Sequence, residues 1–180
     1  MKAAIFEPFC GASGDMVIAA LLDAGANAGK VKGAMESIAD VRVEIRKVEK
    51  RGIRATQVLV SSDRRIVKYP DLIKEIKNSS IDKSIISDAL AIFDIIASAE
   101  ARIHNIAKQK LHFHEVGAAD AIADVIGACT AYRDLELHKG KVYCLPISVG
   151  GGFVETAHGM LPVPAPATIE ILRSSNLLFE

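Results

Sequence analysis

The chain has 180 residues, of which 22 are basic and 22 acidic, so its formal net charge is zero. Half of the residues are hydrophobic and 24% are charged, which is typical of a globular protein large enough to bury a core. This balance gives no general attraction to nucleic acid or to an anionic membrane surface, so we expect neither as a partner.

The sequence also bears on the cellular compartment. No apolar run approaches the roughly 18 residues that a membrane-spanning helix needs, and residues 1–7 are typical of a strand rather than of a signal sequence. The three cysteines, Cys10, Cys129 and Cys144, share no disulfide or metal-binding spacing. We therefore expect a cytoplasmic protein with reduced cysteines.

The apolar periodicity predicts strands and helices in a mixed order. In chain order, the predicted elements are a strand over residues 2–7, helices over 15–24 and 28–40, a hairpin of strands 41–48 and 53–61 with a bulge near 47–48, helices over 70–77, 82–107 and 118–137, a strand over 142–149, and a helix over 167–173. The expected fold class is α+β, a mixed α/β sandwich in which several helices pack a small sheet that includes an antiparallel hairpin. Residues 1–180 are expected to form one domain.

The most informative segment begins at His112 and holds two imidazoles and three carboxylates within thirteen positions. If residues 111–115 are extended, His112 and His114 share one face while Phe113 points into the protein. Asp120 and Asp124 fall one helical turn apart, where like charges repel, so a compensating cation is expected. Imidazole combined with carboxylate suits Ni, Mn, Co or Zn better than Ca. The candidate metal ligands are His112, His114, Glu115, Asp120 and Asp124.

A purely structural interpretation of this segment remains open. Asp120 lies in a predicted first helical turn, where the helix dipole and the free N–H groups favour a carboxylate. Paired histidines are often merely exposed, and the segment has no HExxH or CxxC signature.

A second candidate site is the loop over residues 9–16, between the first predicted strand and helix. Gly11, Ser13 and Gly14 could let backbone N–H groups approach an anion at the end of the helix. The loop matches neither the Walker pattern nor GxGxxG, and Asp15 would repel a phosphate unless a metal ion lay between them. Alternatively, Ser13 or Asp15 only caps the helix. A further histidine, His158, stands alone, and such a residue is more often structural than catalytic.

Three segments of the chain read F-x-G-A-S-G-D-M (residues 9–16), H-F-H-E-V-G-A-x-D (residues 112–120) and A-H-G-x-L-P-V-P-A-P-A-T (residues 157–168). Together they resemble the amino-terminal half of the nickel-pincer cofactor nickel chelatases, also called nickel insertion proteins of lactate racemase maturation (LarC). The resemblance covers essentially the whole chain, in order. The long second and third strings make it highly specific.

The resemblance implies CTP-dependent insertion of nickel into pyridinium-3,5-bisthiocarboxylic acid mononucleotide, with formation of one nickel–carbon and two nickel–sulfur bonds. Nickel would be the substrate ion, and Mn or Mg would accompany CTP. On this basis we assign catalytic roles to Asp15 and His158 and cofactor binding to Gly11, Ser13 and Gly14. The expected metal ligands are those named above.

The sequence departs from the family in its first loop, which reads Glu7-Pro8-Phe9-Cys10-Gly11 where the family usually has Asp-Cys-Phe-Ser-Gly, and in the absence of histidine from residues 63–69. Full-length members continue into a carboxy-terminal domain associated with nickel and nucleotide binding. We therefore expect CTP and the pyridinium mononucleotide as ligands, and either a homo-oligomer or a separate carboxy-terminal subunit as partner. A split subunit, a paralogue and a truncated chain all remain open. The alternative function is a metal- or partner-binding module without independent catalysis.

Overall fold

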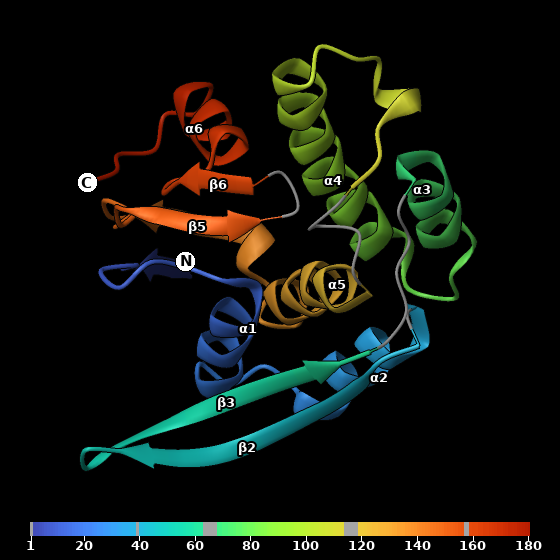
Figure 1. Cartoon of the computed structure of the whole chain (residues 1–180). Coiled ribbons are helices and arrows are strands. Elements are labelled where there is room, and N and C mark those ends of the chain that lie inside the picture. Colours follow the sequence, from blue (N-terminus) through green and yellow to red (C-terminus); the bar gives the residue numbers. More distant parts are fainter. Residues whose placement is uncertain (1, 39, 63–67, 114–118, 157–158) are drawn as a thin grey trace.

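The computed structural model describes residues 2–38, 40–62, 68–113, 119–156 and 159–180 (Figure 1). Its elements, in chain order, are β1 (Ala3–Phe6), α1 (Gly14–Asp23), α2 (Ala28–Ile38), β2 (Arg42–Lys50), β3 (Ile53–Ser61), α3 (Tyr69–Asn78), α4 (Lys83–Ile103), the 3-10 turn η1 (Lys108–Lys110), α5 (Ala119–Asp134), the 3-10 turn η2 (Leu137–Lys139), β4 (Lys141–Cys144), β5 (Phe153–Thr156), β6 (Gly159–Pro162) and α6 (Pro166–Arg173). The described strands form three two-stranded sheets. The predicted α+β class is therefore confirmed.

Helix α5 lies at the centre of the molecule and packs against α1, α2 and α4 (Figure 1). Ile122 and Ile126 belong to a core shared with α3 and α4, whereas Ala123 belongs to a second core shared with α1, α2 and the β2–β3 hairpin. Gly127 lets the helices approach closely, because a Cβ at this position would lie 2.7 Å from the Met35 sulfur. Helix α5 thus joins the two cores.

The β2–β3 hairpin packs on α1 and α2, and its register differs from the prediction in one respect. Lys47 lies opposite Thr56 and Val48 opposite Ala55 in an unbroken ladder, so the predicted bulge is wrong. The apolar alternation breaks at Lys47 because its side chain, on the same face as buried Val43, forms an ion pair with Asp23 of α1 at 2.5 Å. A polar contact, rather than an extra residue, causes the change of pattern.

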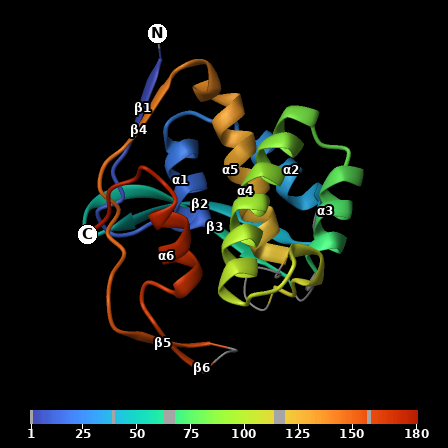
Figure 2. The same ribbon diagram turned by 90° about the horizontal axis from the view of Figure 1, so that it is seen from above.

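The parallel sheet formed by β1 and β4 continues beyond its named strands. Ile5 lies opposite Tyr143, and the backbone N–H of Ile147 donates to the carbonyl of Leu178 at 2.9 Å. The N–H of Val149 donates to the carbonyl of Glu180 at 2.9 Å. The end of the described chain therefore lies beside residues 147–149 as a third extended segment. Figure 2 shows β1, β4 and the carboxy terminus at one side of the molecule, with α1 inward of them.

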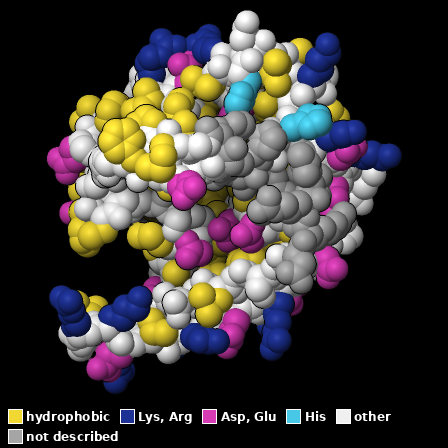
Figure 3. Space-filling view, in the orientation of Figure 1, with side chains coloured by type: hydrophobic (Ala, Val, Ile, Leu, Met, Phe, Trp, Pro, Cys, Tyr) yellow, Lys and Arg dark blue, Asp and Glu magenta, His cyan; other side chains and the backbone are white. Residues whose placement is uncertain are grey.

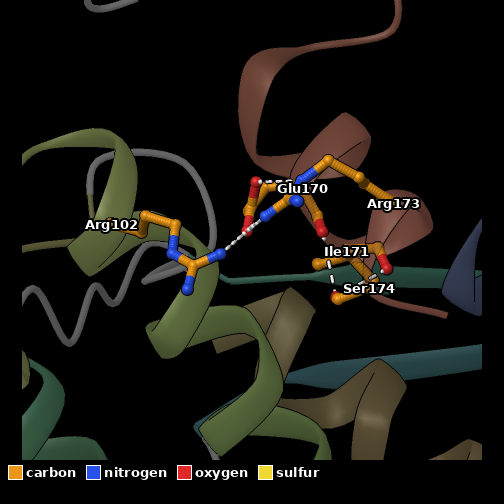
Figure 4. A network of polar contacts seen from close by, with 5 residues as sticks. All are labelled: Arg102, Glu170, Ile171, Arg173 and Ser174. Carbon is orange, nitrogen blue, oxygen red and sulfur yellow. Dashed lines mark hydrogen bonds and ion pairs between the residues drawn. The ribbon is translucent and has the colours of Figure 1, made fainter.

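The last part of the chain was only partly predicted. The sequence analysis does not predict the β5–β6 hairpin, because both strands have only four residues and β6 contains a glycine and a proline. Helix α6 was expected, and it is fastened to α4 by Glu170, whose carboxylate binds Arg102 and Arg173 (Figure 4). The two guanidinium groups lower the pKa of Glu170 to about 2, mainly through the hydrogen bonds from Arg173 and then Arg102.

Helix α4 begins one residue after Asp82, whose side chain accepts a hydrogen bond from the Ser84 N–H and caps the helix. It ends at Ile103 rather than at the predicted residue 107, with His104 as its C-cap. No described helix is both long enough and apolar enough to cross a membrane.

Candidate functional site

The first candidate loop leads from β1 into α1. Gly11 has a φ of +83°, a backbone conformation that glycine adopts without a steric penalty. Ser13 is the N-cap of α1, but its side chain makes no capping hydrogen bond to the helix. Its hydroxyl instead donates to the Asp15 carboxylate, which also accepts the Met16 N–H at 2.9 Å. The loop thus fixes the orientation of the Asp15 side chain.

The start of α1 meets α5 at Gly14 and Asp124. A Cβ placed on Gly14 would lie 2.5 Å from the Asp124 Cβ and 2.6 Å from its Oδ2, closer than real side chains allow. Glycine at this position is what admits the aspartate. Sequence reasoning assigned Gly14 to cofactor binding and missed this contact, because the two residues are far apart in the chain and share no periodic signal.

Asp124 is surrounded in a way that disfavours its charge. Burial, and then the negative charges of Asp15 and Asp120, raise the pKa of its carboxyl to about 6. A hydrogen bond from the Asp15 backbone N–H acts in the opposite direction. The buried Oδ1 atom has no hydrogen-bond partner among the residues that the structure describes. A buried, unpaired oxygen next to two other carboxylates is costly unless a proton or a cation joins it.

The three carboxylates come from the first two turns of two helices. Asp15 lies in the first turn of α1 and Asp120 in the first turn of α5, where its carboxylate accepts the Ala121 N–H at 2.8 Å. Figure 3 shows acidic side chains gathered near the centre of the face drawn. The N–H groups of Asp15 and Met16 already bind carboxylates, so a phosphate at this end of α1 would need a metal ion between them.

Of the other predicted site residues, the structure describes His112 but not the remaining three. His112 is exposed between buried Leu111 and Phe113, and Phe113 packs edge-on against Tyr69 at 5.9 Å between ring centroids. The predicted alternation of this segment is therefore confirmed as far as Phe113. Three predicted site residues lie outside the described residues: His114, Glu115 and His158.

No preformed metal site is present in the described part of the chain. A group of three or more His, Cys, Asp or Glu side chains that could hold a metal ion does not occur among those residues. Besides burial, Asp15 and Asp120 raise the pKa of Asp124, but the three carboxylates do not by themselves form such a group. The arrangement can attract a divalent cation, and it would need further ligands to hold one tightly.

Comparison with known proteins identifies the family to which this chain belongs. The family model described as nickel insertion protein matches residues 4–179. The chain therefore belongs to the nickel insertion protein family, as its sequence motifs indicated.

Curated relatives whose names refer to nickel insertion support this assignment. The chain is 46% identical over 179 residues to a protein of Methanococcoides burtonii, a match that covers 98% of this chain and 45% of the relative. It is 47% identical over 182 residues to one of Methanosarcina mazei, covering 99% and 46% respectively. It is 38% identical over 178 residues to one of Archaeoglobus fulgidus, covering 98% and 45%.

The chain thus spans slightly less than half the length of the curated relatives it matches. No solved structure shows a significant similarity to it.

Proposed function

We propose that this chain corresponds to the amino-terminal half of a nickel chelatase and takes part in the CTP-dependent insertion of nickel into pyridinium-3,5-bisthiocarboxylic acid mononucleotide. The observation that carries the proposal is the unpartnered, buried carboxylate oxygen of Asp124 beside Asp15 and Asp120, in a member of the nickel insertion family. Nickel is the substrate ion in this scheme, and Mn or Mg accompanies CTP. The cytoplasm suits the free cysteines, of which Cys10 and Cys144 are exposed.

In this proposal Asp124 receives the incoming ion. With a pKa of about 6, its carboxyl is mostly ionised at neutral pH although part of it is buried, so a cation at this point relieves an unfavourable charge. Asp15 and Asp120 add negative charge beside it. His112, His114 and Glu115 supply the further ligands expected from the sequence, since imidazole and carboxylate suit a borderline ion such as nickel.

The mononucleotide is proposed to approach the same loop. The carbon that binds nickel must lose a proton as the nickel–carbon bond forms. Asp15 and His158 accept this proton and carry it away. The phosphate lies beside Gly11, Ser13 and Gly14, and a metal ion bridges it to the loop. The bridge is needed because carboxylates already bind the nearby N–H groups of α1. CTP binding would therefore rest largely on the part of the relatives that this chain does not span.

A second candidate function is a metal- or partner-binding module without catalysis of its own. One observation favours it in its partner-binding form: the chain spans only about 45% of its relative from Methanococcoides burtonii, so more than half of that relative lies outside the match.

The insertion reaction itself separates these functions. The purified chain is incubated with CTP, Mg²⁺, Ni²⁺ and the bis-thiocarboxylate mononucleotide, with and without a separately produced polypeptide comprising the unmatched part of the Methanosarcina mazei relative. We expect the nickel-containing product only when both polypeptides are present, and at least a tenfold loss with Asp124→Asn. Asp71→Asn, which alters an exposed first-turn aspartate of α3, should retain full activity.

Three results would reject the proposed role. They are efficient turnover by the other polypeptide alone, turnover by this chain alone, and an Asp124→Asn variant as active as Asp71→Asn. Nickel binding by the chain without any product in the combined reaction would favour the binding module.

A further inference from the structure

The sheet formed by β1 and β4 is poorly covered. All four residues of β4 are exposed, and the paired side chains of Ile5 and Tyr143 are 68% and 51% exposed. Ala4 and Phe6 alternate with Ile5 in β1 and pack against the core that contains α1. Ile5 and Tyr143 therefore lie on the opposite face, directed away from this core.

An uncovered parallel sheet is unusual for a physical reason. Parallel strands occur almost only where both faces are covered, and their residues are correspondingly apolar. A pair of strands is also too small to be stable by itself. Here the extended segment at the end of the chain adds Leu178 and Phe179, which are 70% and 47% exposed. The sheet has the composition and topology of a buried layer, but the described chain leaves the face that carries Ile5 and Tyr143 exposed.

The covered face is also incompletely filled. A groove of about 610 Å³ runs between β1 and α1, and its wall on α1 is formed by small or apolar residues, including Val17 and Ala20. All of β1 borders this groove, and within the described chain β4 is the strand paired with β1. One edge of β1 is therefore open beside an apolar groove. An extended segment can pair with this edge as an additional strand.

The length of the relatives indicates what covers this sheet. More than half of each relative lies outside the match to this chain, and the end of the described chain is hydrogen-bonded into the sheet at residues 147–149. A polypeptide that continues from this point would begin at the edge of the uncovered sheet (Figure 2).

We propose that the β1–β4 sheet and its terminal segment form the docking surface for the remaining half of the family's polypeptide, which completes the sheet and covers the face that carries Ile5 and Tyr143. This inference rests on the part of the proposed function that makes this chain one half of an enzyme. It assigns the interface to a defined surface, the face of the sheet that carries the exposed Ile5 and Tyr143.

The test measures association directly. The chain is titrated by calorimetry with the separately produced remainder of the Methanosarcina mazei relative, without nickel or CTP, and hydrogen exchange is recorded on both polypeptides. We expect saturable one-to-one binding and slowed exchange in β1, β4 and residues 177–180. Ile5→Asp should weaken binding at least tenfold, whereas Ile53→Asp, at a residue that is 72% exposed in the β2–β3 hairpin, should leave it unchanged.

A second pair of variants guards against a folding defect. Tyr143→Ser should weaken binding, and Ile95→Ser, at a residue that is 53% exposed on α4, should not; thermal melts establish that each variant is folded. Absence of binding, protection elsewhere, or equal effects of Ile5→Asp and Ile53→Asp would overturn the proposal. So would a dimer of the chain alone that protects β1 and β4, since a second copy would then occupy the surface. The association experiment measures no nickel chemistry, so its outcome is independent of the insertion assay. Binding of the two polypeptides without insertion activity would reject the proposed reaction and leave the proposed interface intact.

Discussion

Replacing Asp124 with asparagine should stabilise the metal-free protein at neutral pH. The folded state raises the pKa of this carboxyl from 3.8 to about 6, first through burial and then through Asp15 and Asp120. A tenfold change in proton affinity between the unfolded and folded states corresponds to about 1.4 kcal/mol. After allowance for solvent screening of a half-buried group, the ionised side chain lowers the free energy of unfolding by about 1–3 kcal/mol. Asparagine keeps the size of the side chain and removes its charge.

The pH dependence has a definite sign. Below pH 3.8 the carboxyl is protonated in both states, so its charge costs nothing. As the pH rises from 3.8 to about 6, the unfolded chain releases this proton while the folded protein retains it, and stability falls. Above about pH 6 the Asp124 carboxyl also ionises in the folded protein, and the loss of stability no longer changes with pH. The advantage of Asp124→Asn over the unmodified protein should therefore be absent near pH 3.5 and fully present at pH 7.

Urea unfolding between pH 3.5 and 8, with a chelator present, measures this difference, and Asp71→Asn serves as the control. Comparison of each variant with the unmodified protein cancels the titration of the carboxylates that do not interact with Asp124. A stability difference that does not change with pH, or a less stable Asp124→Asn protein at pH 7, would show that the burial and charge argument is wrong.

Two further substitutions test other parts of the site. Gly14→Ala should destabilise the protein by about 1–3 kcal/mol in urea unfolding, because the new methyl group would overlap Asp124; Gly33→Ala in α2, with nothing within 4 Å of the added carbon, should instead be stabilising by up to about 1 kcal/mol. Equal effects of the two glycine substitutions would contradict the close packing. The double substitution of His112 and His114 by alanine should weaken nickel binding in calorimetry, and binding to the unmodified protein should weaken in acid, because a protonated imidazole cannot bind a metal ion. Phe113→Leu should mainly lower the melting temperature, and undiminished nickel binding in the double variant would remove both histidines from the site.

Local patterns predicted the local structure well. The expected alternation correctly directed Phe113 into the protein and left His112 exposed beside it. The spacing of Asp120 and Asp124 placed both on one helix, which the structure confirms. The bulge near Lys47 was wrong because alternation alone cannot distinguish an extra residue from a lysine that reaches an aspartate on another element.

Long-range contacts were beyond such patterns. The fit of Asp124 against Gly14 depends on how α1 crosses α5, and this crossing leaves no periodic trace in the sequence. The exposure of β1 and β4 could not be predicted either, since an apolar strand has the same sequence pattern whether or not another layer covers it. The sequence motifs did identify the family, which the comparisons confirm over residues 4–179.

A nickel titration at pH 7.5 tests the central claim most directly, namely that the acidic cluster at the ends of α1 and α5 receives the metal. Calorimetry is performed on the purified chain and on its Asp124→Asn variant under identical conditions. We expect saturable binding of one nickel ion per chain, weakened at least tenfold by the substitution. Equal affinity in the two proteins, or no binding to either, would contradict it.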